Sequence, residues 1–114
     1  MPYINIDLSR TITPEKKDAV RTKIGELITL LPGKTADVVI ITFSDGKTMY
    51  FRGQEQENCA YVDVRLNGTC GFEIKQNFTK AMFTMFAETL DIDSELMYLT
   101  ILEYTTWGIR GTLK

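Results

Sequence analysis

The sequence predicts an α+β protein, a two-layer sandwich in which a four-stranded mixed sheet carries two helices on one face. The order strand, helix, strand occurs twice, at residues 2–44 and 59–104. The helical segments carry apolar residues at spacings of three and four, and most strand segments alternate apolar with polar residues. Right-handed crossovers place both helices on the same face of one sheet. We therefore expect two pseudo-symmetric β-α-β units in a single domain over residues 1–114.

The first unit begins with a strand and continues into a helix. Ile4, Ile6 and Leu8 alternate with polar or half-polar residues, which is typical of a half-buried strand. Thr13-Pro14-Glu15 provides a hydroxyl cap, a proline at the first helical position and an acid in the first turn. Pro32-Gly33 ends this helix. Its apolar stripe consists of Val20, Ile24, Leu27, Ile28 and Leu31.

The second strand of this unit is expected at residues 38–43. Val-Val-Ile-Ile-Thr-Phe is a nearly continuous apolar run, which is typical of a strand covered on both faces. Asp45-Gly46 predicts a turn, and Met49-Tyr50-Phe51 predicts a short strand after it.

The second unit repeats the order at residues 59–104. Residues 60–66 alternate as a strand, and Asn67-Gly68 predicts a turn. A helix is expected from about residue 73 to residue 90, and Asp91-Ile92-Asp93-Ser94 ends it. A largely apolar strand follows at residues 96–104. The apolar positions of the helix are Ile74, Phe78, Met82, Met85 and Phe86.

The predicted strands carry apolar or aromatic residues on both sides, which is more than one layer of helices covers. A monomer rarely leaves a large apolar patch exposed to water. We therefore expect a partner subunit on the second sheet face, and so an obligate oligomer.

Composition excludes several classes of protein. The chain has 114 residues, of which 44% are hydrophobic and 25% charged, as in ordinary globular proteins. Thirteen basic against fifteen acidic residues give a net charge of −2, which argues against a nucleic-acid partner. No apolar stretch approaches the roughly 20 residues that span a bilayer, and the first residues do not resemble a signal peptide. We expect a soluble, cytoplasmic protein without a membrane partner.

The chemistry available is restricted as well. The sequence contains no histidine, which excludes Ser-His-Asp and Cys-His catalysis and the commonest zinc ligand. Cys59 and Cys70 do not form a CxxC motif, and we interpret them as thiols of a reducing compartment. We expect neither a metal nor a cofactor.

Pro2 is the first candidate for catalysis. Removal of Met1 would expose Pro2 as a secondary amine, and an α-amino group has a pKa of about 7.7–8.0. Burial and a neighbouring cation both lower the pKa of such an amine, which could then accept a proton at neutral pH. The alternative is that Pro2 only starts the first strand.

Lys34 is the second candidate, because its loop precedes a strand that should neighbour the first. A cation there would lower the pKa of the amine and bind an anionic group of a substrate. The alternative is an ordinary solvated lysine. Arg65 and Arg110 are other candidates for binding a carboxylate.

The chain resembles the tautomerase superfamily, and within it most closely the macrophage migration inhibitory factor (MIF) branch. The resemblance covers essentially the whole chain and combines a Met-Pro start, the doubled strand-helix-strand order and a Gly-Lys after the first helix. The segments that carry it are Pro2-Tyr3-Ile4-Asn5, Leu31-Pro32-Gly33-Lys34, Cys59-Ala60, Asn77-Phe78-Thr79-Lys80 and Met97-Tyr98-Leu99-Thr100. It implies a homotrimer of sheets with active sites at the subunit boundaries. It also implies a cofactor-independent keto–enol tautomerase that acts on a small α-keto acid such as phenylpyruvate.

The resemblance also implies roles for individual residues. Pro2 matches the catalytic base, and Lys34 matches the cation beside it. Asn67 falls where the family uses the backbone amide of an isoleucine to bind the substrate carboxylate. Tyr98 matches a pocket tyrosine donated by the adjacent subunit, and Thr100 falls where an asparagine is often found.

Further positions concern the aromatic wall of the expected pocket and the alternative functions of this chain. Trp107 could form the aromatic wall of the pocket, whereas Val62 replaces a cysteine needed for thiol-redox activity. A related alternative is a hydratase, dehalogenase or decarboxylase of a small unsaturated acid, with Arg65, Arg110 and Glu103 in the site. A further alternative is a non-catalytic, cytokine-like binding protein.

Overall fold

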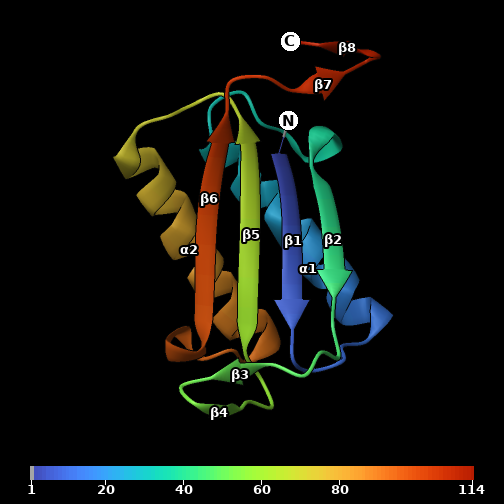
Figure 1. Cartoon of the computed structure of the whole chain (residues 1–114), viewed down its shortest axis with the longest axis vertical. Coiled ribbons are helices and arrows are strands. Elements are labelled where there is room, and N and C mark those ends of the chain that lie inside the picture. Colours follow the sequence, from blue (N-terminus) through green and yellow to red (C-terminus); the bar gives the residue numbers. More distant parts are fainter. Residues whose placement is uncertain (1) are drawn as a thin grey trace.

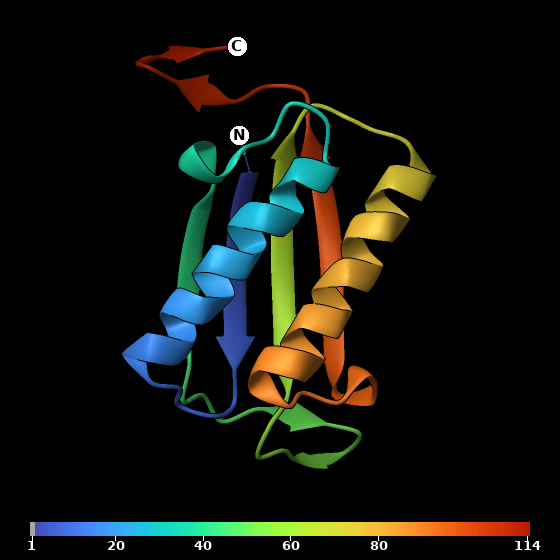
Figure 2. The same ribbon diagram turned by 180° about the vertical axis from the view of Figure 1, so that it is seen from behind.

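A computed structural model describes residues 2–114 and contains one four-stranded sheet with two helices on one face (Figures 1 and 2). The sheet order is β2-β1-β5-β6, with β1 parallel to β2, antiparallel to β5, and β5 parallel to β6. The predicted α+β sandwich of two β-α-β units is therefore confirmed. The strands are β1 (Pro2–Leu8), β2 (Ile40–Ser44), β5 (Ala60–Asn67) and β6 (Met97–Tyr104), and the helices are α1 (Pro14–Leu27) and α2 (Phe72–Leu90).

The core lies between the sheet and the helices. Ile4, Ile6 and Leu8 of β1 point into it, as their alternation predicts, and they pack with Phe78 and Phe86 of α2 in one buried cluster. Thr13 caps α1, because its hydroxyl accepts a hydrogen bond from the backbone N–H of Lys16. The helix stripes and the strand faces identified in the sequence therefore meet in a single apolar layer.

Two segments differ from the sequence prediction. The strand expected at residues 38–43 begins only at Ile40, because the 3₁₀ turn η2 (Ala36–Val38) takes up its first residue. This strand forms an edge of the sheet, and 61% of Ile40 is exposed, so within one chain it is not covered on both faces. The first helix ends at Leu27 and continues as the 3₁₀ turn η1 (Ile28–Leu30).

Several short elements complete the chain. The strand β3 (Tyr50–Phe51) was expected, but its partner β4 (Gln54–Glu55) was not. The glycine-punctuated tail forms a hairpin of β7 (Gly108–Ile109) and β8 (Thr112–Leu113), which lies beyond one end of the sheet (Figure 1). A third 3₁₀ turn, η3 (Ser94–Leu96), precedes β6.

The sheet face opposite the helices combines polar hydrogen bonds with exposed rings. Asn5 accepts hydrogen bonds from the hydroxyls of Thr42 at 2.7 Å and Ser44 at 3.2 Å. The hydroxyl groups of Tyr61 and Thr100 lie 2.7 Å apart on the other two strands. This face, called the open face below, is therefore more polar than the sequence pattern suggested. Its exposed large hydrophobic residues are Ile40, Tyr98 and Leu102.

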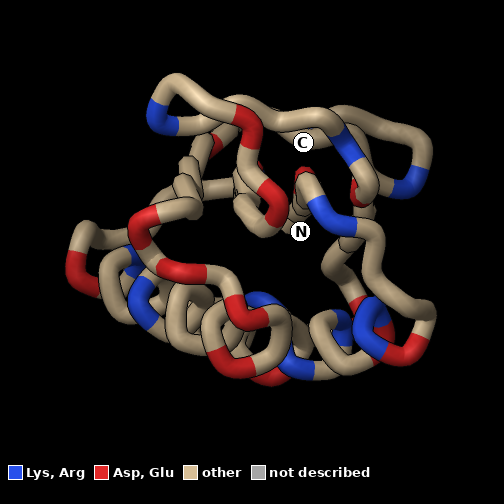
Figure 3. Tube along the Cα trace, turned by 90° about the horizontal axis from the view of Figure 1, so that it is seen from below, with Lys and Arg blue, Asp and Glu red and all other residues tan. Residues whose placement is uncertain are grey.

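Charges are distributed without segregation over the described chain. Figure 3 shows Lys and Arg interspersed with Asp and Glu along the helices and the loops. This arrangement agrees with the net charge of −2 and offers no continuous basic stripe over residues 2–114.

Asp45 fastens the loop between β1 and α1 to the turn after β2. Its carboxylate accepts the backbone N–H of Ile12 at 3.0 Å and lies 3.3 Å from the ammonium of Lys17. The hydrogen bond from Ile12 lowers the pKa of Asp45 most, and Lys17 lowers it further. Gly46 follows with a φ of +68°, and a Cβ atom there would lie 2.6 Å from the Thr11 hydroxyl. The close approach of the two loops and the left-handed backbone together favour glycine at that position.

We predict that Asp45→Ala lowers the free energy of unfolding by about 1–2 kcal/mol at neutral pH, because the Ile12 N–H loses a charged acceptor. The pKa of Asp45 is lowered in the folded chain, so its contribution is complete above the pKa of an unfolded aspartate. The contribution disappears as the pH falls through the lowered value, and the difference between the two proteins should narrow there. Urea unfolding at several pH values measures both effects.

Asp18→Ala is the matched control. Asp18 pairs with Arg21 on the exposed surface of α1, and its loss should change stability by less than about 0.5 kcal/mol. Equal losses for the two variants at neutral pH would show that Asp45 does not fasten these loops.

Candidate functional site

Three separate segments meet at the end of the sheet where β1 starts. Pro2 is buried there and is in register with Leu66, the penultimate residue of β5. The loop between α1 and β2 crosses the same end, and the β7–β8 hairpin extends beyond it (Figure 1). This end of the sheet therefore brings together Pro2, the loop that contains Lys34, and the last residues of β5.

A tight turn positions Lys34. The backbone N–H of Lys34 donates to the carbonyl of Leu31 at 3.2 Å, which closes a four-residue turn. Pro32 has a restricted φ, and Gly33 has a φ of +72°, which is the pattern of a type II turn. The half-buried Lys34 side chain then donates from Nζ to the carbonyl oxygen of Asn67 at 2.8 Å. The Pro-Gly signal in the sequence thus accounts for where the cation lies.

This hydrogen bond places a positive charge close to Pro2. Asn67 follows Leu66, and cross-strand partners in antiparallel sheets have Cα atoms about 4.5–5.5 Å apart. A cavity of about 60 Å³ lies between the Lys34 loop and residues 66–70. It has room for water but not for a keto acid. Within one chain, a substrate therefore needs space outside this cavity.

A larger cleft opens beside Tyr3 on the open face, whereas Pro2 is on the opposite, buried side of β1 and does not line it. The cleft has a volume of about 440 Å³, which is within the range of small-molecule sites. The guanidinium carbon of Arg65 lies 5.4 Å from the ring centroid of Tyr3, and Trp107 packs edge-on against Tyr104 at 5.8 Å. The residues that line the cleft are Tyr3, Ile40, Arg65, Tyr104, Thr106, Trp107 and Gly108.

Lys34, Asn67 and Trp107 thus lie at the same end of the sheet as Pro2, but the other two predicted site residues do not. Tyr98 pairs with Tyr61 near the start of β6. The residue of β6 that is level with Pro2 and Leu66 is Glu103, which comes five residues after Tyr98. Five strand residues span about 17 Å. Tyr98 packs instead against Phe51 at 4.8 Å, and Thr100 bonds to Tyr61. One chain cannot bring Tyr98 to its own Pro2.

The three residues considered for hydratase or dehalogenase chemistry are dispersed. Glu103 faces the helices, where its carboxylate accepts from the backbone N–H of Cys70 at 2.8 Å and from Lys75 at 2.9 Å. Lys75 first, and then the Cys70 N–H, lower the pKa of Glu103. Arg65 lies on the open face, and Arg110 lies at the exposed turn of the β7–β8 hairpin with a φ of +52°. Glu103 therefore fastens the loop before α2 rather than facing a substrate.

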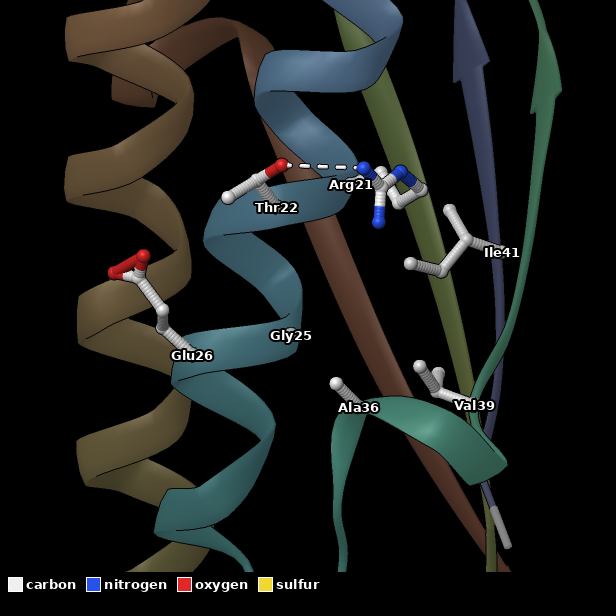
Figure 4. A pocket seen from close by; sticks show the side chains of 7 residues that line it. All are labelled: Arg21, Thr22, Gly25, Glu26, Ala36, Val39 and Ile41. Carbon is white, nitrogen blue, oxygen red and sulfur yellow. Dashed lines mark hydrogen bonds between the residues drawn. The ribbon is translucent and has the colours of Figure 1, made fainter.

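A further cleft, of about 530 Å³, lies between α1, η2 and β2 (Figure 4). Ala36, Val39 and Ile41 provide an apolar wall. None of the catalytic or substrate-binding residues predicted from the sequence lines this cleft. Its guanidinium, from Arg21, is held by Asp18 at 2.7 Å and by Thr22. This groove follows the exposed edge of the sheet, and the carboxylate of Glu26 points toward α2, away from the apolar wall (Figure 4).

The sequence did not single out five of the residues that line this cleft, namely Tyr3, Ile40, Tyr104, Thr106 and Gly108. Alternation along the first strand places Tyr3 on the sheet face that points away from the core, so its position on the open face could have been predicted from the sequence. The pairing of Tyr3 with both Ile40 and Arg65 depends on the strand register, which alternation alone does not determine.

Residues 2–114 contain neither a candidate metal site nor a candidate membrane-spanning helix. In this part of the chain, His, Cys, Asp and Glu side chains do not gather in groups of three that could bind a metal ion. Neither described helix combines the length and the apolar character needed to cross a bilayer.

The sequence model of the macrophage migration inhibitory factor family matches residues 1–113. No curated protein matches the sequence.

Solved structures share this fold at low sequence identity. MIF2 of Leishmania major has a TM-score of 0.90 at 23% identity, over 100% of this chain and 97% of that one. A MIF-like protein of Entamoeba histolytica has a TM-score of 0.83 at 19% identity, over 99% and 98% of the two chains. N1, a member of the cis-3-chloroacrylic acid dehalogenase family, has a TM-score of 0.85 at 17% identity, over 97% and 82%. At these identities the likeness shows the fold alone.

We predict that Lys75→Met raises the pKa of the Glu103 carboxyl toward its ordinary value, because the variant removes the cation that lowers it most. The Cys70 N–H should keep part of the lowering. A carbon-detected NMR titration of the Glu103 carboxyl measures the change. Lys80→Met, at an exposed position of the same helix, is the control and should leave this titration unchanged. Identical titrations in both variants would contradict the structural role given to Glu103.

Proposed function

This chain belongs to the macrophage migration inhibitory factor family, and we propose that it is a cofactor-independent keto–enol tautomerase. The substrate class is a small α-keto acid such as phenylpyruvate. The observation that carries the proposal is the hydrogen bond from the Lys34 ammonium to the Asn67 carbonyl, at 2.8 Å. Asn67 is the residue after Leu66, which is the strand partner of the buried Pro2.

Pro2 is the general base in this proposal. Its secondary amine, once free and uncharged, takes a proton from the carbon next to the substrate carbonyl. The electrons of that C–H bond form the C=C bond of the enol, and the protonated Pro2 returns its proton to the carbonyl oxygen, which restores the neutral amine. Burial of Pro2 and the nearby Lys34 both disfavour the protonated amine, which keeps the base available at neutral pH. Met1, whose removal the mechanism requires, lies outside the described residues.

Lys34 and the backbone amide of Asn67 bind the substrate carboxylate. A lysine ammonium has three N–H donors, and the Asn67 carbonyl occupies one of them. The remaining donors are available to a carboxylate and to the enolate charge that develops in the transition state. Trp107 provides an aromatic wall at the same end of the sheet.

Tyr98 and Thr100 act in the site of a neighbouring subunit. Because Tyr98 lies about 17 Å along the sheet from the row of Pro2, its part in the pocket requires another copy of the chain. A homotrimer whose sheets pack around a central axis would supply that copy. It would also cover the open face, on which Tyr98, Ile40 and Leu102 are exposed.

We predict that Pro2→Ala lowers kcat/KM for phenylpyruvate enolisation by about 10²–10⁴-fold, because the variant lacks the pre-positioned secondary amine. Keeping Met1, verified by mass spectrometry of the intact protein, should abolish turnover, since the nitrogen of Pro2 is then an amide. Circular dichroism checks that each protein is folded. Equal rates for trimmed wild type and Pro2→Ala would contradict the role of Pro2. No turnover of any keto acid by trimmed wild type would favour a non-catalytic binding protein.

A second prediction tests the shared site. Tyr98→Phe retains the ring that packs on Phe51, and it should lower kcat/KM by about 10²-fold through loss of the hydroxyl. Co-expression with Pro2→Ala should restore activity above that of either parent. In random trimers about a quarter of the sites combine an intact Pro2 with an intact neighbouring Tyr98. Activity in the mixture no higher than the mean of the two parents would contradict sites at subunit boundaries.

A further inference from the structure

We infer that Glu103 is a positioning residue for substrate binding, because it holds the loop of residues 68–71 and through this loop sets the positions of Asn67 and Lys34. The inference rests on the proposed function, in which Lys34 and the backbone amide of Asn67 bind the substrate carboxylate. Glu103 itself faces the helices, where its carboxylate contacts groups of the chain. It therefore acts on the site through the backbone and without touching the substrate.

Glu103 joins three parts of the fold. Its Oε2 atom accepts a hydrogen bond from the backbone N–H of Cys70 at 2.8 Å, and its Oε1 atom accepts from the ammonium of Lys75 at 2.9 Å. Only 21% of the Glu103 side chain is exposed. One carboxylate oxygen thus binds the loop and the other binds α2, while the residue itself belongs to β6.

The loop is short and is fastened to β6 at two points. Residues 68–71 alone connect β5 to α2. The N–H of Gly68 donates to the carbonyl of Tyr104 at 2.8 Å, and the N–H of Cys70 donates to the neighbouring Glu103. Without the Glu103 carboxylate, the loop would keep only the first of these two bonds.

The bond from Gly68 is directly linked to the Lys34 contact. The N–H of Gly68 and the carbonyl of Asn67 belong to one planar peptide group. This carbonyl accepts from Lys34 at 2.8 Å, so a rotation of the peptide group moves the acceptor away from the ammonium. A cavity of about 60 Å³ lies between the loop and the segment that carries Lys34. Packing therefore leaves the loop room to move on that side, and its hydrogen bonds to β6 hold it.

The negative charge of Glu103 would by itself oppose the proposed chemistry. Glu103 is level with Leu66 and Pro2, two strand spacings or about 10 Å from Pro2. A free carboxylate at that distance repels a substrate anion and favours the protonated amine of Pro2. The ion pair with Lys75 offsets this charge. Loss of the charge should therefore tighten anion binding, whereas loss of the hydrogen bond to Cys70 should weaken it.

Oxamate measures this binding without turnover, because it has the carboxylate and carbonyl of an α-keto acid but no C–H bond to enolise. We expect it to shift the amide resonance of Asn67 in an NMR titration of the trimmed wild type. Glu103→Met should raise the Kd of oxamate about 10-fold, since the variant removes the acceptor of the Cys70 N–H. It should raise KM for phenylpyruvate similarly and change kcat by less than about threefold, because the carboxylate is bound in both ground and transition states.

Three further variants separate position from charge. Glu103→Gln removes the same charge but keeps an oxygen that accepts from the Cys70 N–H, so its Kd should stay within about twofold of wild type. Glu103→Asp keeps the charge but is shorter by one carbon–carbon bond, and it should weaken oxamate binding as Glu103→Met does. Glu73→Met removes one negative charge at an exposed position in the first turn of α2, and as the matched control it should not weaken binding. Circular dichroism checks that each variant is folded at the assay temperature.

The outcomes separate this inference from the proposed function. The positioning role is refuted if Glu103→Gln weakens oxamate binding as much as Glu103→Met, if neither Glu103→Met nor Glu103→Asp weakens it, or if kcat falls without a rise in KM. It is also refuted if oxamate leaves the Asn67 amide of wild type unshifted. If Glu103→Met does not fold, the contrast between Glu103→Asp and Glu103→Gln decides.

Pro2→Ala should bind oxamate within about twofold of wild type, because the base takes no part in binding. Equal turnover by Pro2→Ala and wild type would therefore overturn the proposed mechanism and leave the role of Glu103 in anion binding supported. Unchanged oxamate binding in Glu103→Met and Glu103→Asp, with turnover that depends on Pro2, would refute the positioning role alone.

Discussion

The hydrogen bond between the Lys34 ammonium and the Asn67 carbonyl joins segments that are far apart in the sequence at the end of the sheet where the chain begins. It depends on the Pro32-Gly33 turn after α1 and on the pairing of β1 with β5, which sets Pro2 opposite Leu66. Neither segment alone would place a cation near the first residue of the strand. The fold therefore contributes to the chemistry mainly through register, since a shift of one residue would reverse which side chains face the helices.

The elements that periodicity could predict are those that bury a continuous apolar face. The second helix was expected at residues 73–90 and extends over Phe72–Leu90, because Asp91 adopts the left-handed conformation that ends it. The β3–β4 and β7–β8 hairpins have strands of two residues, too short to show a period. The late start of β2 is also invisible to periodicity, because Val38, the last residue of η2, continues without a break into the apolar residues of β2.

The candidate site likewise contains residues that the sequence could predict and residues that it could not. Pro2 and Lys34 could be inferred from local chemistry, because Pro2 directly follows Met1 and Lys34 lies in a Pro-Gly turn. The neighbours of Arg65 could not, because Tyr3, Tyr104 and Trp107 come together only through the register of three strands and the path of the hairpin. Tyr98 illustrates the limit of a single chain. Resemblance assigned it to the pocket, whereas its position in β6 makes any such role depend on assembly.

The hairpin that carries Trp107 is closed by backbone groups alone. The N–H of Trp107 donates to the carbonyl of Lys114 at 2.9 Å, and the N–H of Lys114 donates in return at 3.0 Å. The Lys114 side chain takes no part in this pairing. Any residue with a backbone N–H can therefore make this pairing at position 114, and only proline would remove a donor. A deletion within the hairpin would shift the register of these bonds and release the indole.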